Sequence, residues 1–274
     1  SRFMELTEDS GYFFGQYISE GCVGDNGLIR FSSHRKEGAI RGLLARIANE
    51  VWNLRTREWT WGNSGCLSIC CGALARVLAV TCGRGAACKR LPNFTFSNPA
   101  FAKGVLRGAW DGDGHLPTGP VGRPAYCTVS HDLAYGISQL LSALGILAMK
   151  DWAKNGPERE VWRIGIASRD DPALRDLLER DPVRSVLSGR TIAVEGGWLV
   201  PVSVRGGRYT GDVYNLEVAE DHSYCVEGVA VHNCLPVVES MAAGVPNVVT
   251  AYSACRELVE KGGGELIDVL AYVN

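Results

Sequence analysis

The sequence predicts an α+β protein whose first part is built from two similar units. Two apolar segments, Gly11–Gly21 and Val105–Gly114, have the composition of helices that end in an acidic residue followed by glycine. A single offset of 93 residues aligns the central glycines of the two helices and also aligns Glu20 with Asp113. Short β-like runs take over near position 191, and the pattern changes again after position 234.

Similar elements follow the two helices. After the first come a predicted strand, Leu28–Phe31, and a helix with apolar residues at helical spacing around Ala39–Val51. After the second come a predicted strand, Ala125–Val129, a helix, Leu133–Leu144, and a strand, Val161–Ile166. The recurrence of strand and helix after each acidic helix supports a duplicated unit.

These patterns divide the chain into three predicted domains, 1–190, 191–233 and 234–274. The second is predicted to be β-rich, with strands at Thr191–Val194, Trp198–Val202, Val213–Val218 and Tyr224–Val226. The third has an α/β pattern, because a predicted helix stops at Gly244 and the strand Asn247–Thr250 follows.

The composition is that of a globular protein. With 274 residues, 46% of them hydrophobic and 21% charged, the chain can build a core. No run approaches the roughly 18–20 apolar residues of a membrane span, so no membrane partner is expected. The chain lacks an apolar targeting segment and begins with Ser1 rather than methionine, so we expect a fragment of a cytoplasmic protein.

Five of the ten cysteines lie between Cys66 and Cys88, and no pair there has the spacing CxxC. Because zinc sites usually contain such a pair, we expect buried, reduced thiols, with a zinc site as the alternative. Reduced thiols also favour a reducing compartment such as the cytosol.

Charge is distributed unevenly along the chain. Ser10–Thr95 contains eleven Lys and Arg against five Asp and Glu, Phe96–Val204 contains twelve of each, and Arg205–Asn274 contains four against ten. A basic segment can supply phosphate contacts to a nucleic acid. The first repeat is therefore predicted to supply them, with an uneven surface of no function as the alternative.

The paired acidic residues favour a metal site. An acid at a helix C-terminus faces the negative end of the helix dipole, which is unfavourable for structure alone. If the helices pack side by side, with Gly15 and Gly108 permitting close approach, Glu20 and Asp113 emerge at the same end. Two such oxygen ligands suit Mg²⁺. The alternative is a pair of glycine-capped helices with incidental acids.

The segments Phe13–Gly21 and Leu106–Gly114 resemble the signature helices of LAGLIDADG homing endonucleases. The second helix matches the pattern closely, with both of its acids, whereas the first has Ile18 in place of the first acid and glutamate in place of the second. The resemblance covers about residues 10–190. It implies two pseudo-symmetric αββαββα units, at about 10–92 and 100–190, and a monomeric protein whose strands lie in the major groove of double-stranded DNA.

The resemblance also implies Mg²⁺-dependent cleavage of both DNA strands, with Glu20 and Asp113 as catalytic metal ligands. Lys89–Pro92 resembles the family's Lys-x-hydrophobic-Pro element. Lys89 would then polarise the attacking water or stabilise the charged phosphorane. A solvated turn lysine is the alternative, and Lys150 is a weaker candidate near the equivalent place in the second repeat.

The end of the second domain resembles the last two motifs of self-splicing inteins. The matching segments are Val213–Val218, His222–Tyr224 and Gly228–Cys234. In that chemistry the side-chain amide of Asn233 attacks its own carbonyl, while His232 acts as general acid and His222 activates the amide. Cys234 supplies a thiolate that accepts the upstream host segment as a thioester.

Two features depart from a complete intein. Asn215 stands where the family more often has an acid. An N-terminal splicing half, with a first-residue nucleophile and a Thr-x-x-His motif, has no counterpart before the first acidic helix. We therefore expect the chain to splice only with an N-terminal intein half and host segment as partners.

The segment after Cys234 resembles the donor-site segment of retaining GT-B glycosyltransferases, family 4-like, with Glu239 as the second of two glutamates. Glu239 would bind the ribose of a nucleotide-sugar donor. The leading hypothesis is therefore an intein fragment, a DNA endonuclease with an autocatalytic splicing end. The alternatives are a cleavage-inactive LAGLIDADG module that binds DNA or RNA, and a glycosyltransferase fragment. The last matches only about forty residues, fewer than a domain usually needs.

Overall fold

Seven elements occur twice in the same order along the chain. The computed structural model describes residues 4–118, 122–154, 160–167 and 170–181, with short segments at 192–194, 197–199, 223–226, 229–232, 242–244, 248–250 and 265–267. The chain divides into two compact units, Ser1–Pro201 and Val202–Asn274.

The first repeat contains α1 (Glu8–Glu20), β1 (Gly21–Val23), β2 (Leu28–His34), α2 (Gly38–Trp52), β3 (Thr56–Trp61), β4 (Ser64–Cys70) and α3 (Gly72–Cys82). The short helices η1 (Ala86–Cys88) and η2 (Asn93–Ser97) connect it to the second repeat. The second repeat contains α4 (Pro99–Asp113), β5 (Gly114–His115), β6 (Ala125–Thr128), α5 (His131–Ala143), β7 (Ala148–Lys154), β8 (Glu160–Ile166) and α6 (Asp171–Leu177). The predicted α+β class and the order αββαββα are confirmed.

Each repeat forms one antiparallel four-stranded sheet with the same strand order, β1-β2-β4-β3 in the first and β5-β6-β8-β7 in the second. The register also matches, because Gly21 pairs with Phe31 and Gly114 pairs with Tyr126. One face of each sheet is covered by helices, and residues such as Ile29 are fully buried there. Alternate residues lie on the opposite, open face.

Capping residues explain where the two central helices begin. Thr7 forms a capping box with Ser10 at the start of α1, and the Asn98 side chain accepts hydrogen bonds from the first turn of α4. Both helices end at a glycine, Gly21 and Gly114, whose backbone N–H closes the last turn. The two acidic residues are therefore the last residues of their helices.

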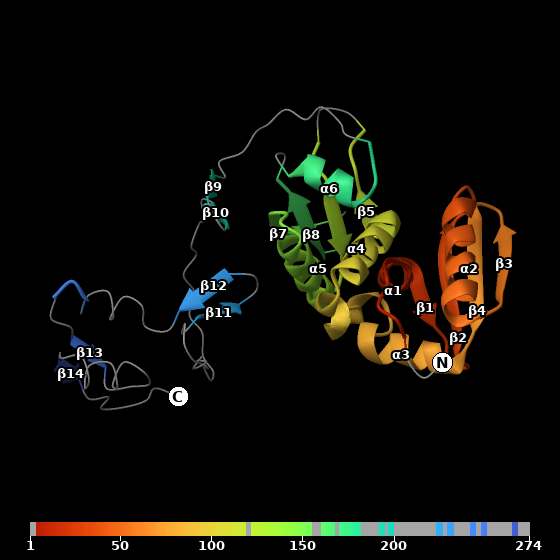
Figure 1. Ribbon diagram of the computed structural model, residues 1–274, viewed down its shortest axis with the longest axis horizontal. Helices are drawn as coiled ribbons and strands as arrows, with labels where there is room; N and C mark the ends of the chain where they lie inside the picture. Colours follow the sequence, from red (N-terminus) through yellow and green to blue (C-terminus); the bar gives the residue numbers. More distant parts are fainter. Residues whose placement is uncertain are drawn as a thin grey trace. The chain divides into compact units, whose positions relative to one another are not determined.

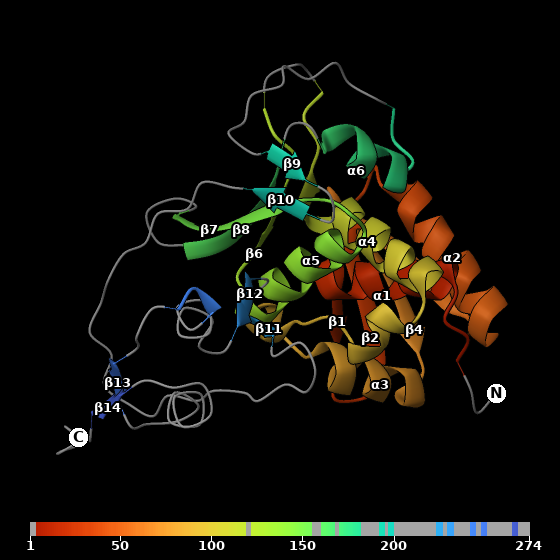
Figure 2. The same cartoon turned by 60° about the vertical axis from the view of Figure 1, so that its left-hand side comes forward.

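α1 and α4 pack backbone against backbone between the two sheets (Figure 1; Figure 2). A Cβ atom added at any of four glycines would overlap a carbonyl oxygen of the other helix. These glycines are Gly11, Gly15, Gly104 and Gly108. Their partners obey the offset of the sequence repeat, since Gly11 faces Phe101 and Gly104 faces Glu8. The two repeats are thus related by a pseudo-twofold axis between the helices.

Aromatic side chains fill the core around the two helices. Phe13 of α1 contacts the rings of Phe31 and Trp52 at centroid distances of 4.9 and 4.8 Å. Phe14 contacts Phe101 of α4 at 5.6 Å. These edge-on contacts join the first sheet and α2 to α1, and α1 to α4.

Five strands of the first unit were not predicted individually, namely β1, β3, β4, β5 and β7. The expectation of buried thiols was wrong for Cys70 and Cys88, which are exposed, whereas Cys82 is buried. The seven cysteines from Cys22 to Cys127 are all free. No described helix is long and apolar enough to cross a membrane.

Short hairpins follow in sequence. β9 (Ile192–Val194) pairs with β10 (Gly197–Leu199), and in the second unit β11 (Ser223–Val226) pairs with β12 (Val229–His232). β13 (Val248–Thr250) pairs in parallel with β14 (Glu265–Ile267). The predicted strand Val213–Val218 and most of the helix predicted after Cys234 lie outside the described residues.

The close packing of the central helices makes a testable prediction. In Gly15→Ala the new methyl group would press against backbone atoms of Val105, Gly108 and Ala109, which cannot turn aside as a side chain can. We expect the free energy of unfolding to fall by at least about 2 kcal/mol, measured by denaturant titration. The matched control is Gly42→Ala on α2, where a Cβ meets nothing within 4 Å. It should gain about 0.5–1 kcal/mol, and equal effects of the two changes would contradict the packing role.

Candidate active site

The C-terminal ends of α1 and α4 bring Glu20 and Asp113 together. A Cβ atom at Gly112, in the last turn of α4, would lie 3.1 Å from Cγ of Glu20, so this side chain reaches across to the other helix. No basic residue occupies the last turn of either helix. The carboxylates therefore lie between β1 and β5, at the facing ends of the two sheets, where the helix dipoles add further negative potential.

This arrangement disfavours two negative charges. Burial, together with the nearby carboxylates of Asp113 and Glu37, raises the pKa of Glu20 to about 7. Asp113 is exposed at its outer edge, yet the protein around it removes enough water to raise its pKa as well, while the Lys89 ammonium opposes that rise. The charge of Asp113 therefore acts on the pKa of Glu20, whereas burial is what raises the pKa of Asp113.

The donor set fits a hard divalent cation. Two carboxylates whose charges repel each other are stabilised by a cation between them, and Mg²⁺ is commonly held by one or two carboxylates plus water and phosphate. Among the described residues no group of three or more His, Cys, Asp or Glu side chains could hold a metal ion. The remaining ligands would therefore be water and substrate oxygens.

Lys89 lies beneath this site and is only 3% exposed. Its Nζ donates hydrogen bonds to the carbonyl oxygens of Tyr17 and Gly21, at 2.6 and 2.9 Å, and lies 3.4 Å from the centroid of the Tyr17 ring. Burial lowers the pKa of Lys89 to about 8. The alternative of a solvated turn lysine is thus wrong, because the ammonium caps the C-terminus of α1 next to Glu20.

Lys89 also connects the two repeats. Its carbonyl oxygen accepts a hydrogen bond from Oγ of Ser130 at 2.5 Å, and the same hydroxyl caps α5 through the N–H of Leu133. Leu91 is buried against Gly136 of α5. Lys150 does not match Lys89 in position, because it lies on β7, the counterpart of β3, whereas Lys89 follows α3. The expected equivalence of these two lysines is wrong.

Other polar side chains around the carboxylates were not predicted. Ser19 donates to the carbonyl oxygen of Ala109 at 3.0 Å and lies 3.0 Å from the hydroxyl of Tyr126, which joins α1 to the second sheet. Asp111, the first acid of the second helix, accepts a hydrogen bond from Tyr12 and pairs with Arg180. Asp111 is therefore held by structural contacts. The sequence offered one signal for Ser19: the offset of 93 residues aligns it with Gly112, a residue with no side chain, at the place where the two helices meet.

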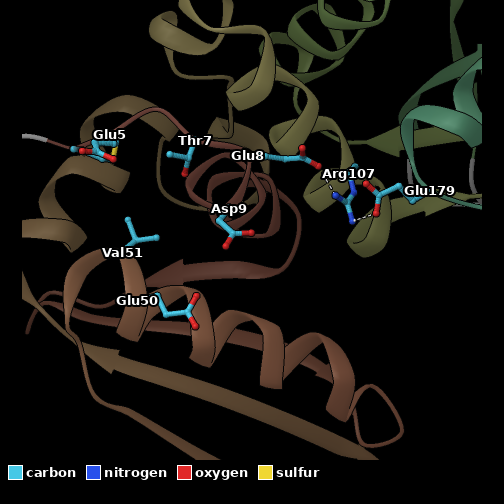
Figure 3. A pocket seen from close by; sticks show the side chains of 9 residues that line it. Glu5, Thr7, Glu8, Asp9, Glu50, Val51, Arg107 and Glu179 are labelled. Atoms are coloured by element: carbon cyan, nitrogen blue, oxygen red, sulfur yellow. Dashed lines mark hydrogen bonds and ion pairs between the residues drawn. The ribbon is translucent and has the colours of Figure 1, made fainter.

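The opposite end of the helix pair has a different character. A pocket of about 850 Å³ lies there, beside the first turn of α1 (Figure 3). Five of its lining side chains are acidic, namely Glu5, Glu8, Asp9, Glu50 and Glu179. Arg107 pairs with two of these acids. Twelve residues of helix separate Glu8 from Glu20, about 18 Å at about 1.5 Å per residue, so this pocket is distant from the candidate site and unsuited to a polyanion.

Of the predicted splicing residues, the described part of the chain includes the backbone of His232, the last residue of β12, which pairs with Ser223 of β11. His222, Asn233 and Cys234 lie outside the described residues, as does Glu239. The roles of these residues, including the nucleotide-sugar site expected at Glu239, stay predictions from the sequence.

The raised pKa of Glu20 predicts how stability depends on pH. Since the pKa rises from 4.5 to about 7, the folded state holds this proton more tightly than the unfolded state, and stability falls as the pH increases through that interval. Glu20→Gln removes the penalty. We expect the variant to melt at a higher temperature than the parent at about pH 8 in metal-free buffer, and the two to converge at about pH 4. A variant that melts lower at the higher pH would show that the Glu20 carboxylate is not under electrostatic stress.

Comparison with known proteins shows a family match for the second repeat. Residues 100–178 match the LAGLIDADG-like domain family. The chain is 28% identical over 255 residues to "ATP-dependent DNA helicase Hel308" of Thermococcus kodakarensis, covering 84% of this chain and 22% of that protein. It is 24% identical over 283 residues to "Uncharacterized protein MJ0043" of Methanocaldococcus jannaschii, covering 94% of this chain and 34% of that protein. The chain thus spans about a fifth to a third of the length of these curated relatives.

Solved structures share the fold at low sequence identity. I-DmoI, a homing endonuclease, in complex with DNA and Mn has a TM-score of 0.50 and 12% identity, covering 65% of this chain and all of that one. This likeness concerns the fold alone. Together with the family match, it shows that the chain contains a LAGLIDADG-like domain within an α+β fold like that of LAGLIDADG homing endonucleases.

Proposed function

We propose that the first unit is a site-specific endonuclease that cuts both strands of DNA with a divalent cation, Mg²⁺ in the cell. The observation that carries the proposal is the convergence of Glu20 and Asp113 at one end of two closely packed helices, between the edges of two sheets. LAGLIDADG homing endonucleases cleave DNA, and the I-DmoI complex contains DNA and Mn.

The chain's own residues would hold and orient the reacting groups. Glu20 and Asp113 would bind the cation through carboxylate oxygens, which offsets the loss of solvation that raises the pKa of both groups and the repulsion that adds to the pKa of Glu20. When bound, the cation supplies Lewis-acid stabilisation of negative charge at the scissile phosphate. Lys89 would fix the last turn of α1, and hence Glu20, while its ammonium adds positive charge close to Asp113.

Replacing one metal ligand tests the proposal. Asp113→Asn should abolish Mg²⁺-dependent cleavage of a plasmid library with randomised inserts, because a neutral amide binds the cation far more weakly than a carboxylate. Binding of duplex DNA should change by less than about twofold, because the proposed DNA contacts come from the sheets, whereas Asp113 would contact the cation. Gel electrophoresis measures cleavage, and anisotropy of a labelled duplex measures binding.

The matched control is Asp111→Asn, two residues earlier on the same helix, where the acid is bound to Tyr12 and Arg180. This variant should retain cleavage, with reduced thermal stability. Cleavage by Asp113→Asn at the parent's rate would contradict the metal assignment. A parent that binds DNA but never cuts it would favour the alternative of a cleavage-inactive binding module.

We also propose that the second unit contains a peptide-cleaving end. The β11–β12 hairpin supports it, because the register places Ser223 opposite His232. His222 and Asn233 are the chain neighbours of Ser223 and His232. In the proposed step the Asn233 amide nitrogen attacks its own carbonyl carbon, the bond to Cys234 breaks, and His232 donates a proton to the leaving amine.

Expression together with a separate N-terminal splicing segment tests this step. Mass spectrometry should detect a released peptide that starts at Cys234, and Asn233→Ala should block its release because alanine has no side-chain amide. Asn247→Ala is the matched control and should leave release intact. Release that persists in Asn233→Ala would rule out cyclisation of the asparagine.

A further inference from the structure

The two sheets can be compared position by position on their open faces. The pairs Gly21–Phe31 and Gly114–Tyr126 occupy equivalent places, and Phe31 pairs with Leu67 as Tyr126 pairs with Ile164. Every open-face residue of β2, β4 and β3 that lies within the shorter second sheet therefore has a register-matched counterpart on β6, β8 and β7. This comparison reveals a difference in charge and in aromatic content.

Residues paired side by side across three neighbouring strands form a row, and each row of the first sheet that lies within the shorter second sheet has a counterpart there. The first such row contains two arginines in the first sheet and none in the second. Arg30 and Arg57 both pair with Ser68, so the two cations flank a small side chain on the central strand β4. The counterpart row is Ala125, Gly165 and Met149. Arg30 and Arg57 are exposed, and within the described ranges neither forms an ion pair with a carboxylate.

The second matched row differs in the same direction. In the first sheet Trp59 and Ser32 pair with Cys66, and Trp59 is 47% exposed. In the second sheet Asp151 and Cys127 pair with Arg163. Side chains directly opposite each other on one face lie about 4.5–5.5 Å apart at Cβ, so Asp151 offsets the charge of Arg163.

A second tryptophan extends the open face of the first sheet. Trp61 ends β3 and is 85% exposed, and it shares its face with His34 through their common partner Ser64. The acid of this strand does not neutralise the face, because Glu58 alternates to the other side and pairs with the buried Arg41 at 2.6 Å. The open face of the first sheet thus combines unpaired arginines with exposed indoles.

These side chains fit a nucleic-acid duplex better than a protein. Guanidinium groups pair with phosphate oxygens or with the O6 and N7 atoms of guanine, and an indole can contact a thymine methyl group in the groove. Apart from His115 of β5, which pairs with Ala125, the open face of the second sheet offers small and apolar side chains and one arginine beside an aspartate. It can follow the shape of a groove, but it supplies little charge.

We infer that the two halves of the protein bind DNA unequally. The first sheet anchors the duplex through Arg30, Arg57, Trp59 and Trp61, and the second sheet contributes little of the affinity. This inference rests on the proposed function, because it assumes that the open faces contact DNA. It adds that the half of the DNA site contacted by the first repeat, residues 10–92, contributes most of the binding affinity.

Register-matched substitutions in the full chain test the inference. The probe is a fluorescein-labelled 30-base-pair duplex of mixed sequence, titrated by anisotropy without Mg²⁺ over a series of KCl concentrations. Arg57→Met installs the residue of the matched position, and it should weaken binding about fivefold and reduce the salt slope by about 1. Arg163→Met makes the same change on the second sheet, and it should weaken binding less than about twofold.

Two further variants extend the test. Met149→Arg, the reciprocal of Arg57→Met, should strengthen binding and raise the salt slope by about 1. Trp61→Ala should weaken binding about fivefold or more, because the apolar contact of the indole with the groove, such as with a thymine methyl group, is lost. The substituted side chains lie on the open faces, so melting temperatures close to that of the parent should accompany these effects.

The outcomes distinguish a failure of the proposed function from a failure of the inferred inequality between the two sheets. A parent chain that binds no duplex would overturn the proposed function. A parent that binds, together with equal losses in Arg57→Met and Arg163→Met, would overturn the inequality of the halves and leave the endonuclease proposal standing. Unchanged affinity in Trp61→Ala would remove the tryptophans from the DNA surface and favour a protein partner for them.

Discussion

The contact between α1 and α4 determines where the functional groups lie. At Gly11, Gly15, Gly104 and Gly108 each backbone approaches the other so closely that no side chain fits between them. Helices at this distance end side by side, and the sheets that follow them begin at nearly the same point. The position of the carboxylate pair and the separation of the two open faces are therefore both set by four residues without side chains.

The same contact creates an electrostatic problem at one end of the helices. Glu20 and Asp113 sit where both helix dipoles are negative and where burial weakens solvation, which raises the pKa of both groups. The ammonium of Lys89 offsets part of this potential from below, yet it is committed to the carbonyl oxygens of Tyr17 and Gly21. The unfavourable charge is typical of a site whose electrostatics are complete only when a cation is bound.

Several features could be predicted from the sequence because their signals are local. The apolar helices, their terminal acids and the offset of 93 residues are visible in the chain itself, and they suffice to predict a paired helix core. β3 was missed because all but one of its residues are exposed and its two tryptophans, Trp59 and Trp61, lie on the open face instead of in the core. Its only signal was the Gly62-Asn63 turn between Trp61 and Ser64, which is typical of a hairpin.

The parts of the site that could not be predicted depend on long-range contacts. Lys89 stands between exposed Cys88 and Arg90, and only its bond to Tyr17, 72 residues earlier, explains its burial. The Ser19–Tyr126 contact joins residues 107 positions apart. Such contacts follow from the helix packing and the sheet register together, and neither can be read from local composition.

The segment between the repeats has a consequence for how this chain can be rearranged. Lys89 holds the first repeat through its side chain and the second through its carbonyl oxygen, and Leu91 anchors the next turn against α5. This connection therefore fixes the position of the two repeats through its own contacts, in addition to linking them covalently. Lengthening it, or dividing the protein there into two separately encoded halves, would loosen the support under Glu20 even if both halves still folded and associated. The Gly62-Asn63 turn is exposed and joins two strands of one sheet, so it should tolerate an inserted peptide or a new terminus better.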